Sequence, residues 1–153
     1  MNKKKLILFL VIFVPSFSLF AQNQTSSDVK QNQDMPQTKH YIVMEITSND
    51  SLAWKGAMNN IRHLKEKWAA DVFIELVAHG PGIELFAKNK TTQQKQMQEL
   101  KKGGVIFSAC ANSMKAKNLS KDDIVPEAGI VPSGVVEVIT RQEEKWSYLK
   151  SGF

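Results

Sequence analysis

The chain has 153 residues, of which 42% are hydrophobic and 23% charged, and these values are typical of one soluble globular domain of ordinary size. The formal net charge is +5, but residues 1–21 contain three lysines and no acid, so the chain without them carries only +2. A charge this small and this dispersed argues against nucleic acid as a partner.

The first 21 residues have the pattern of a bacterial secretory signal, in which lysines 3–5 precede an apolar run. That run, Leu6 to Phe20, is 15 residues long and is interrupted by Pro15. A membrane-spanning helix needs about 20 residues, so a cleaved signal is favoured over an uncleaved anchor. We expect cleavage after Ala21 or, as the alternative, after Ser18. The mature protein is then periplasmic or secreted and leaves the membrane.

Residues 22–39 are polar, with five glutamines and no aromatic residue. Such a segment buries too little apolar surface to offset the entropy of ordering it, so we expect a flexible leader. The folded domain is expected to cover residues 40–153.

Strands and helices are predicted to alternate along this domain. The expected strands are Tyr41–Ile46, Val72–Ala78, residues 105–110, Gly129–Val131 and Trp146–Leu149. The first expected helix follows the capping cluster Thr47–Asp50 and ends at Trp68. Three shorter helices are expected over Ile83–Ala87, Thr91–Lys102 and Asn112–Lys117. The last expected helix has Pro132 in its first turn and continues to about Lys145. This order predicts an α/β sandwich with a mostly parallel sheet.

Polar residues follow the first three predicted strands. Ligands of open α/β sheets bind outside the carboxyl ends of the strands. If these strands are neighbours, Asn49, His79 and Cys110 converge on one edge, although Asn49 is most simply a helix N-cap. The turn Gly80–Pro81–Gly82 leads into a helix, and its backbone either cradles an anion or only makes a tight turn. Asn112 and Ser113 begin the helix after Cys110.

Cys110 is the only cysteine, so it cannot form a disulfide within the chain. In an oxidising compartment it is either buried and inert, paired with another chain, or reactive. A thiol facing a helix N-terminus has its thiolate stabilised by the helix dipole and by free N–H groups. His79 is a candidate base or counter-ion for it, or it caps the following turn for structural reasons.

Other chemistries find little support. His40, His63 and His79 have no metal-ligand spacing with the one cysteine. The chain contains neither a G-x-S-x-G element nor a P-loop or G-x-G-x-x-G sequence. We therefore expect no bound metal and no cofactor, and the sequence does not decide whether the protein is an enzyme.

Three segments together resemble the DsrE/DsrF-like family: Val77–Ile83, Gly104–Ala116 and Val131–Val136. The similarity runs from about Tyr41 to Leu149 and is closest to exported, single-domain members. It implies a three-layer α/β/α sandwich with a five-stranded sheet that forms homo-oligomers, often trimers or hexamers built as dimers of trimers. It also implies sulfur carriage as a persulfide on a cysteine after the third strand, a position that Cys110 matches.

The sequence departs from these relatives at two places. Ser113 stands where some have a second cysteine, and Lys117–Asn118 stands where many have Arg-Gly. Without a second thiol, sulfur transfer has to involve a second molecule, such as a thiol-bearing partner protein. We therefore expect a persulfide carrier or sulfurtransferase acting through Cys110. The alternatives are a non-catalytic oligomer that binds a small ligand or anion in the same pocket, and a purely structural oligomer with an inert thiol.

Overall fold

The computed structural model describes residues 38–151, so the predicted signal segment and nearly all of the predicted leader lie outside the described residues. Five strands alternate with helices along this range. The strands are β1 His40–Ile46, β2 Val72–Ala78, β3 Ile106–Cys110, β4 Gly129–Val131 and β5 Ser147–Ser151. The α-helices are α1 Ser51–Trp68, α2 Gln94–Lys102, α3 Ala111–Ala116 and α4 Gly134–Glu143. Short 3₁₀ turns occupy Ala69–Asp71, Gly80–Phe86 and Lys121–Asp123.

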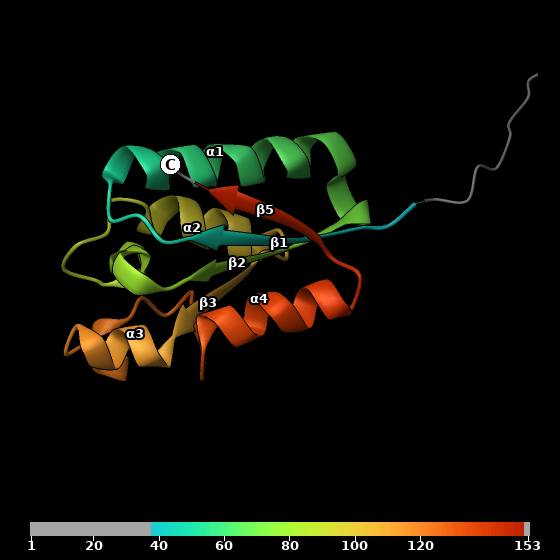
Figure 1. The fold of residues 1–153 in the computed structure, drawn as a ribbon. Helices are drawn as coiled ribbons and strands as arrows, with labels where there is room; N and C mark the ends of the chain where they lie inside the picture. Colours follow the sequence, from blue (N-terminus) through green and yellow to red (C-terminus); the bar gives the residue numbers. More distant parts are fainter. Residues whose placement is uncertain (1–37, 152–153) are drawn as a thin grey trace, which may run out of the picture. The chain divides into compact units, whose positions relative to one another are not determined.

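The strands form one sheet in the order β4-β3-β2-β1-β5, and each pairs in parallel with its neighbours. Helices α1 and α2 cover one face of the sheet and α4 covers the other, which makes the predicted three-layer sandwich (Figure 1). Because β1, β2 and β3 are adjacent, their carboxyl ends share one edge, as the sequence predicts. Helices α3 and α4 both begin near the end of β3 and run in opposite directions from it (Figure 1).

The face toward α1 and α2 holds the main hydrophobic core. Ile42, Met44 and Ile46 alternate along β1 and pack with Trp54 and Ile61 of α1. The alternation follows from the two-residue period of a strand, which sends successive side chains to opposite faces. On α1 the buried residues are Trp54, Ala57, Met58 and Ile61, and their i, i+3, i+4, i+7 spacing places them on one face of the helix.

The face toward α4 is different. Its apolar cluster contains only Val43, Val77 and Val138, with Trp146 packed against it. The same face carries Glu45, Glu75, Ser108 and Cys110 near the carboxyl ends of the central strands, and the exposed Phe73 and Ile106 farther back. The chemistry of the fold is therefore concentrated on one side of the sheet.

Some boundaries differ from the prediction. The cap of α1 is Asp50 and not Asn49, because the Asp50 carboxylate accepts the Leu52 N–H at 2.9 Å. Pro132 precedes the α4 N-cap, Ser133, which is extended, so the proline lies outside the first turn. Residues 80–86 wind as a 3₁₀ turn and not as an α-helix.

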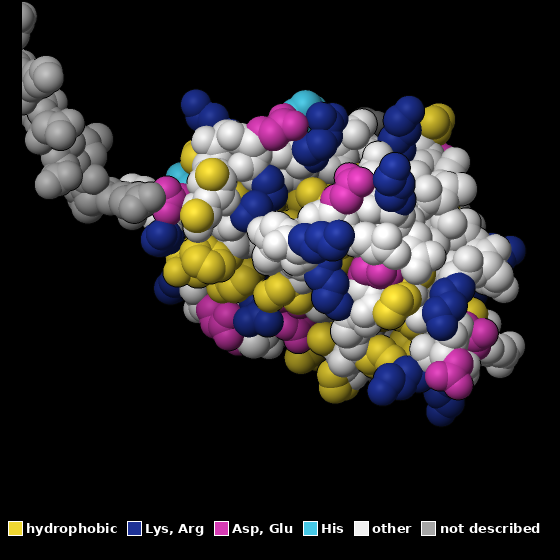
Figure 2. All heavy atoms as spheres, turned by 180° about the vertical axis from the view of Figure 1, so that it is seen from behind, with side chains coloured by type: hydrophobic (Ala, Val, Ile, Leu, Met, Phe, Trp, Pro, Cys, Tyr) yellow, Lys and Arg dark blue, Asp and Glu magenta, His cyan; other side chains and the backbone are white. Residues whose placement is uncertain are grey.

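The surface is mixed in charge. On the face shown in Figure 2, lysine and arginine side chains are spread among acidic, neutral and hydrophobic ones and do not gather into one stripe. Over residues 38–151, no helix has both the length and the apolar character that crossing a bilayer requires.

Candidate functional site

Cys110 is the last residue of β3 and the N-cap of α3. Its side chain lies on the α4 side of the sheet and the residue is only 4% exposed. A short strand that runs directly into a helix places this residue where the first N–H groups of the helix have no intrahelical acceptor. The buried thiol therefore lies at a point where the backbone offers hydrogen-bond donors.

Two helix N-termini supply those donors. The backbone N–H groups of Asn112 and Ser113 from α3 and of Gly134 from α4 lie around the Cys110 sulfur, together with the Ser113 hydroxyl. Burial raises the pKa of the Cys110 thiol, but the hydrogen-bonding influence of these four groups outweighs burial and holds the pKa below its ordinary value. The lowered pKa increases the fraction of thiolate, the nucleophilic form of cysteine, relative to an ordinary thiol.

Ser113 is held in place by the turn after β2. The Gly80 N–H donates to the Ser113 oxygen at 2.8 Å, which leaves the hydroxyl hydrogen free to donate to the Cys110 sulfur. Gly80 has a φ of +54°, a left-handed conformation that favours glycine. The Gly82 N–H is also used within the chain, by the His79 carbonyl at 3.1 Å. These two N–H groups thus maintain the turn and orient Ser113.

Gly134 is the closest point of α4 to the site. A Cβ atom at this position would lie 2.8 Å from the His79 Cβ, 3.2 Å from the His79 Cδ2 and 3.2 Å from the Cys110 Cβ. Any side chain here would push α4 away from both residues. The glycine therefore allows the first N–H of α4 to reach the sulfur, and it shows that His79 and Cys110 flank the same small space.

His79 is fixed by two residues that the sequence analysis did not single out. Its Nε2 lies 2.5 Å from a Glu45 oxygen, and the Tyr148 hydroxyl donates to the other Glu45 oxygen. Burial raises the pKa of Glu45, but the hydrogen bonds from Tyr148 and His79 outweigh it and lower that pKa. Burial and the neighbouring carboxylate raise the pKa of Tyr148 to about 12.

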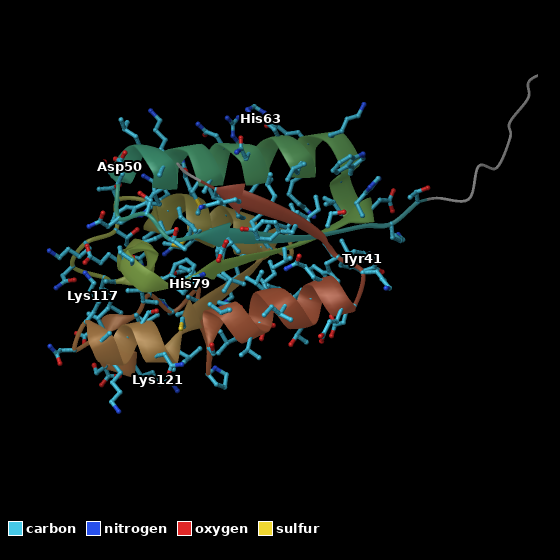
Figure 3. All side chains as sticks on the ribbon, viewed as in Figure 1. Tyr41, Asp50, His63, His79, Lys117 and Lys121 are labelled. Atoms are coloured by element: carbon cyan, nitrogen blue, oxygen red, sulfur yellow. The ribbon has the colours of Figure 1, made fainter. Side chains whose placement is uncertain are left out.

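An ionised Glu45 can only accept, so the His79 Nε2 must carry the proton that joins them. In the neutral imidazole the second nitrogen, Nδ1, is then the free acceptor. His79 lies between the end of β2 and the beginnings of α3 and α4 (Figure 3). Glu45 and Tyr148 thus set both the tautomer and the direction of the one histidine beside the thiol.

The remaining predicted site residues lie farther from the sulfur or contribute backbone only. Asn49 is exposed in the loop to α1, and the adjacent Asp50 begins that helix on the opposite side of the sheet (Figure 3). The Asn112 side chain is exposed, while its N–H reaches the thiol. Gly82 is buried against β1, because a Cβ there would lie 2.3 Å from the Ile46 carbonyl oxygen. The structure therefore joins His79, Ser113 and Cys110 and leaves Asn49 apart.

A surface groove of about 460 Å³ lies on the other face of the sheet, between α1 and β5. Small side chains such as Ala53 and Gly56 line it, together with Asp50 and Lys150. Neither Cys110 nor His79 lines this groove, so it does not coincide with the thiol site. Among residues 38–151, no three His, Cys, Asp or Glu side chains gather as a metal-binding group.

Sequence reasoning missed Glu45, Gly134 and Tyr148. Glu45 had a visible signal, since it is the one acidic residue in an otherwise apolar strand core. Gly134 belongs to a segment that the resemblance marks, but its contact with His79 depends on how α4 packs. Tyr148 reaches Glu45 only because β5 pairs with β1 at the sheet edge, with Tyr148 opposite Val43.

Comparison with known proteins agrees with this architecture. A family model for the DsrE/DsrF-like family matches residues 47–151. A solved structure of a protein of unknown function from Methanobacterium thermoautotrophicum is similar to the chain, with 28% sequence identity and a TM-score of 0.69. The match covers 73% of this chain and 99% of that one. No curated protein matched the chain. The family model spans more than half of the sequence and includes β2, β3 and the Cys110 site, so the chain belongs to the DsrE/DsrF-like family.

Proposed function

We propose that the protein is an exported sulfur carrier that binds sulfane sulfur as a persulfide on Cys110. The observation that carries this proposal is the set of four hydrogen-bond donors around the thiol, which lowers its pKa despite burial. A lone cysteine packed for structure alone needs no such donors, because a neutral thiol is a weak hydrogen-bond acceptor. Membership of a family that includes sulfur-relay proteins supports the same reading.

Loading begins when the Cys110 thiolate attacks the outer sulfur of a small persulfide, R–S–SH. A sulfur–sulfur bond forms between Cys110 and the outer sulfur, and the sulfur–sulfur bond of the donor breaks. The donor leaves as the thiolate R–S⁻ and keeps the electron pair of the broken bond. Neither oxidant nor reductant is consumed. The donors from Ser113 and Gly134 favour the Cys110 thiolate that starts this step and that is released again on unloading.

Unloading requires a second molecule. An acceptor thiolate attacks the outer sulfur of the Cys110 persulfide, the new sulfur–sulfur bond forms on the acceptor, and Cys110 leaves as the thiolate. Ser113 stands at the place where a resolving cysteine would be, and it acts on the sulfur as a donor instead. We therefore propose a thiol-bearing partner as the acceptor, with His79 available to take the proton of the acceptor thiol and so produce the attacking thiolate.

Intact-mass measurement tests this function. The mature protein is incubated with a low-molecular-mass persulfide, excess donor is removed, and the chain mass is compared with that of Cys110→Ser. We expect a gain of about 32 Da that is absent in the variant and is removed by a thiol reductant. A wild-type thiol that alkylates normally yet never gains this mass would contradict the proposal.

A second function is favoured by the burial of the sulfur, which is hard for a protein acceptor to reach at 4% exposure. In that case the same donors hold a small anion beside Cys110 and no sulfur is transferred. Isothermal titration with sulfate separates the two. Binding that is equal in wild type and Cys110→Ser, without persulfide loading of the wild type, identifies a binding module.

We also propose that the protein acts as a homo-oligomer outside the cytoplasm. The support is the pattern of residues 1–21 and the exposure of large apolar side chains, such as Val135, Val136 and Ile139 of α4 and Tyr148 of β5. Light scattering of the mature chain tests the assembly, and the N-terminal mass of protein recovered from the bacterial periplasm tests export and the cleavage point.

A further inference from the structure

Glu75 is the feature of the sheet that the Cys110 site leaves unexplained. It lies in the middle of β2, faces α4, and is only 1% exposed. Every other residue of the strand Val72–Ala78 is apolar. A buried carboxylate in such a strand is costly unless it is paired and fully hydrogen-bonded.

Its partners come from the two elements that meet at Cys110. The Ser108 hydroxyl of β3 donates to one Glu75 oxygen at 2.5 Å, and the Arg141 Nε of α4 donates to the other at 2.5 Å. Arg141 also pairs with Glu137 and Glu144, each at 3.0 Å, and its guanidinium lies 5.0 Å from the Trp146 ring centroid. Arg141 is therefore held on several sides.

The spacing along the chain relates this cluster to the thiol. Ser108 lies two residues before Cys110, on the same side of β3. Arg141 lies seven residues after Gly134, which is about two helical turns, so both face the sheet from the same side of α4. The cluster therefore connects β3 to α4 at a second point, about 10 Å along the helix from the contact between Gly134 and Cys110.

We infer that Ser108, Glu75 and Arg141 form a clamp that sets the position and rotation of α4, so that the Gly134 N–H reaches the Cys110 sulfur. This inference rests on the proposed function, since it concerns the reactivity of the same thiol. A buried ion pair is weak evidence for stability, because an apolar pair of the same size often stabilises as much. Its directional hydrogen bonds, in contrast, specify one arrangement of helix and sheet. These three are positioning residues, and none touches the sulfur.

Replacing Glu75 gives a test in which loss of its charge and loss of the clamp shift the thiol pKa of Cys110 in opposite directions. Glu75→Leu removes a negative charge, and that change alone lowers the thiol pKa of Cys110. Loss of the clamp weakens the Gly134 hydrogen bond and raises the thiol pKa. The rate of iodoacetamide alkylation is measured against pH, without any sulfur donor. We expect the midpoint to move to higher pH and the rate at pH 7 to fall about three- to ten-fold. A midpoint that moves to lower pH or stays unchanged overturns the inference.

Two further variants separate positioning from general destabilisation. Ser108→Ala changes no charge and removes one hydrogen bond of the clamp. The pH midpoint of its alkylation should therefore rise, but by less than that of Glu75→Leu. Val138→Ala removes packing beneath α4 and leaves the clamp intact, so it should lower the unfolding midpoint in urea without moving the pH profile. Equal shifts in Ser108→Ala and Val138→Ala would show a merely structural role.

The same data distinguish this inference from the function. If wild type never loads sulfur but the clamp variants shift the alkylation profile, the proposed function fails and the clamp stands. If wild type loads sulfur and the profiles of Glu75→Leu and Ser108→Ala match wild type, the clamp fails and the function stands.

Discussion

The two faces of the sheet are formed by the same strands but have different roles. In β3, Phe107 and Ala109 point toward the main core, while Ser108 and Cys110 point toward α4. In β2, Leu76 belongs to the core and Glu75 to the charged cluster beneath α4. Helix α4 covers the face that bears Cys110, whereas α1 and α2 cover the face with the main core (Figure 1).

This difference separates stability from chemistry within one layer of backbone. Apolar burial is non-directional and tolerates small shifts, so the core face can secure the fold without fixing one atom against another. Hydrogen bonds to a thiolate need defined positions. The structure obtains them by placing polar side chains and two helix N-termini on the face that contributes less to the core. Variants on the two faces should therefore affect different measurements.

The largest expected effect is on the core face. Phe107 is 1% exposed and packs edge-to-face against Phe86 at 5.9 Å. Phe107→Ala should lower the free energy of unfolding by about 3–5 kcal/mol in urea titrations, because it leaves a cavity in the core. The alkylation profile of the folded fraction should not move. A loss below about 1 kcal/mol would show that this face is not the stabilising one.

The next effect concerns the contact between α4 and the thiol. Gly134→Ala places a Cβ 2.8 Å from the His79 Cβ, so α4 must shift and its N–H must leave the sulfur. The alkylation rate at pH 7 should fall about ten-fold, which corresponds to the loss of one hydrogen bond to a charged group.

Gly56→Ala is the matched control for Gly134→Ala. Gly56 lies on α1, where an added Cβ meets nothing within 4 Å. This substitution should stabilise the helix by roughly 0.5–1 kcal/mol and leave the thiol unaffected. Equal alkylation rates in the two glycine variants would contradict the role given to Gly134.

Ser113→Ala should have a comparable effect on the same property, because its hydroxyl is the largest single influence that lowers the thiol pKa. It removes the side-chain donor but keeps the backbone N–H groups of α3 and α4, so the thiol pKa should rise and the alkylation rate at pH 7 should fall about three- to ten-fold. Asn112→Ala on the same helix turn keeps every donor to the sulfur and should react like wild type. A Ser113→Ala profile identical to that of Asn112→Ala would remove the hydroxyl from the site.

The smallest expected effect is that of Tyr148→Phe. The tyrosine hydroxyl helps to lower the pKa of Glu45, so its loss should raise that pKa toward the ordinary value. A lowered carboxyl pKa stabilises the fold above the unfolded-state pKa, and that stabilisation is lost as the pH falls through the folded-state pKa. The free energy of unfolding of wild type should therefore exceed that of the variant by up to about 1 kcal/mol at pH 7, and the gap should close as the pH falls through the lowered pKa of Glu45. A gap that is constant with pH would show that the hydroxyl does not act through Glu45.

Regular features of the fold could be predicted from the sequence because they depend on local patterns. Val72–Ala78 and Gly129–Val131 are strands with the predicted bounds, and α1 ends at Trp68 as expected. The adjacency of His79 and Cys110 also followed, since neighbouring parallel strands end at one edge. The prediction that Asn49 joins them was wrong, because the position of a strand end does not show to which side of the sheet the next loop turns.

The rest of the site depends on tertiary contacts that leave little trace in the sequence. Gly134 reaches Cys110 only because α4 packs across the sheet, and Tyr148 reaches Glu45 only because β5 joins the edge beside β1. The role of Ser113 likewise requires the left-handed turn at Gly80. Each contact joins residues more than 20 positions apart, so neither periodicity nor spacing indicates it.

The pH dependence of Cys110 alkylation in the wild-type protein tests the central claim most directly, because the chain has one cysteine and intact mass reports it without ambiguity. The account predicts a single transition with a midpoint below the ordinary thiol pKa of about 8.5. A midpoint at or above that value, in protein that remains folded across the titration, would contradict a thiolate stabilised by α3 and α4.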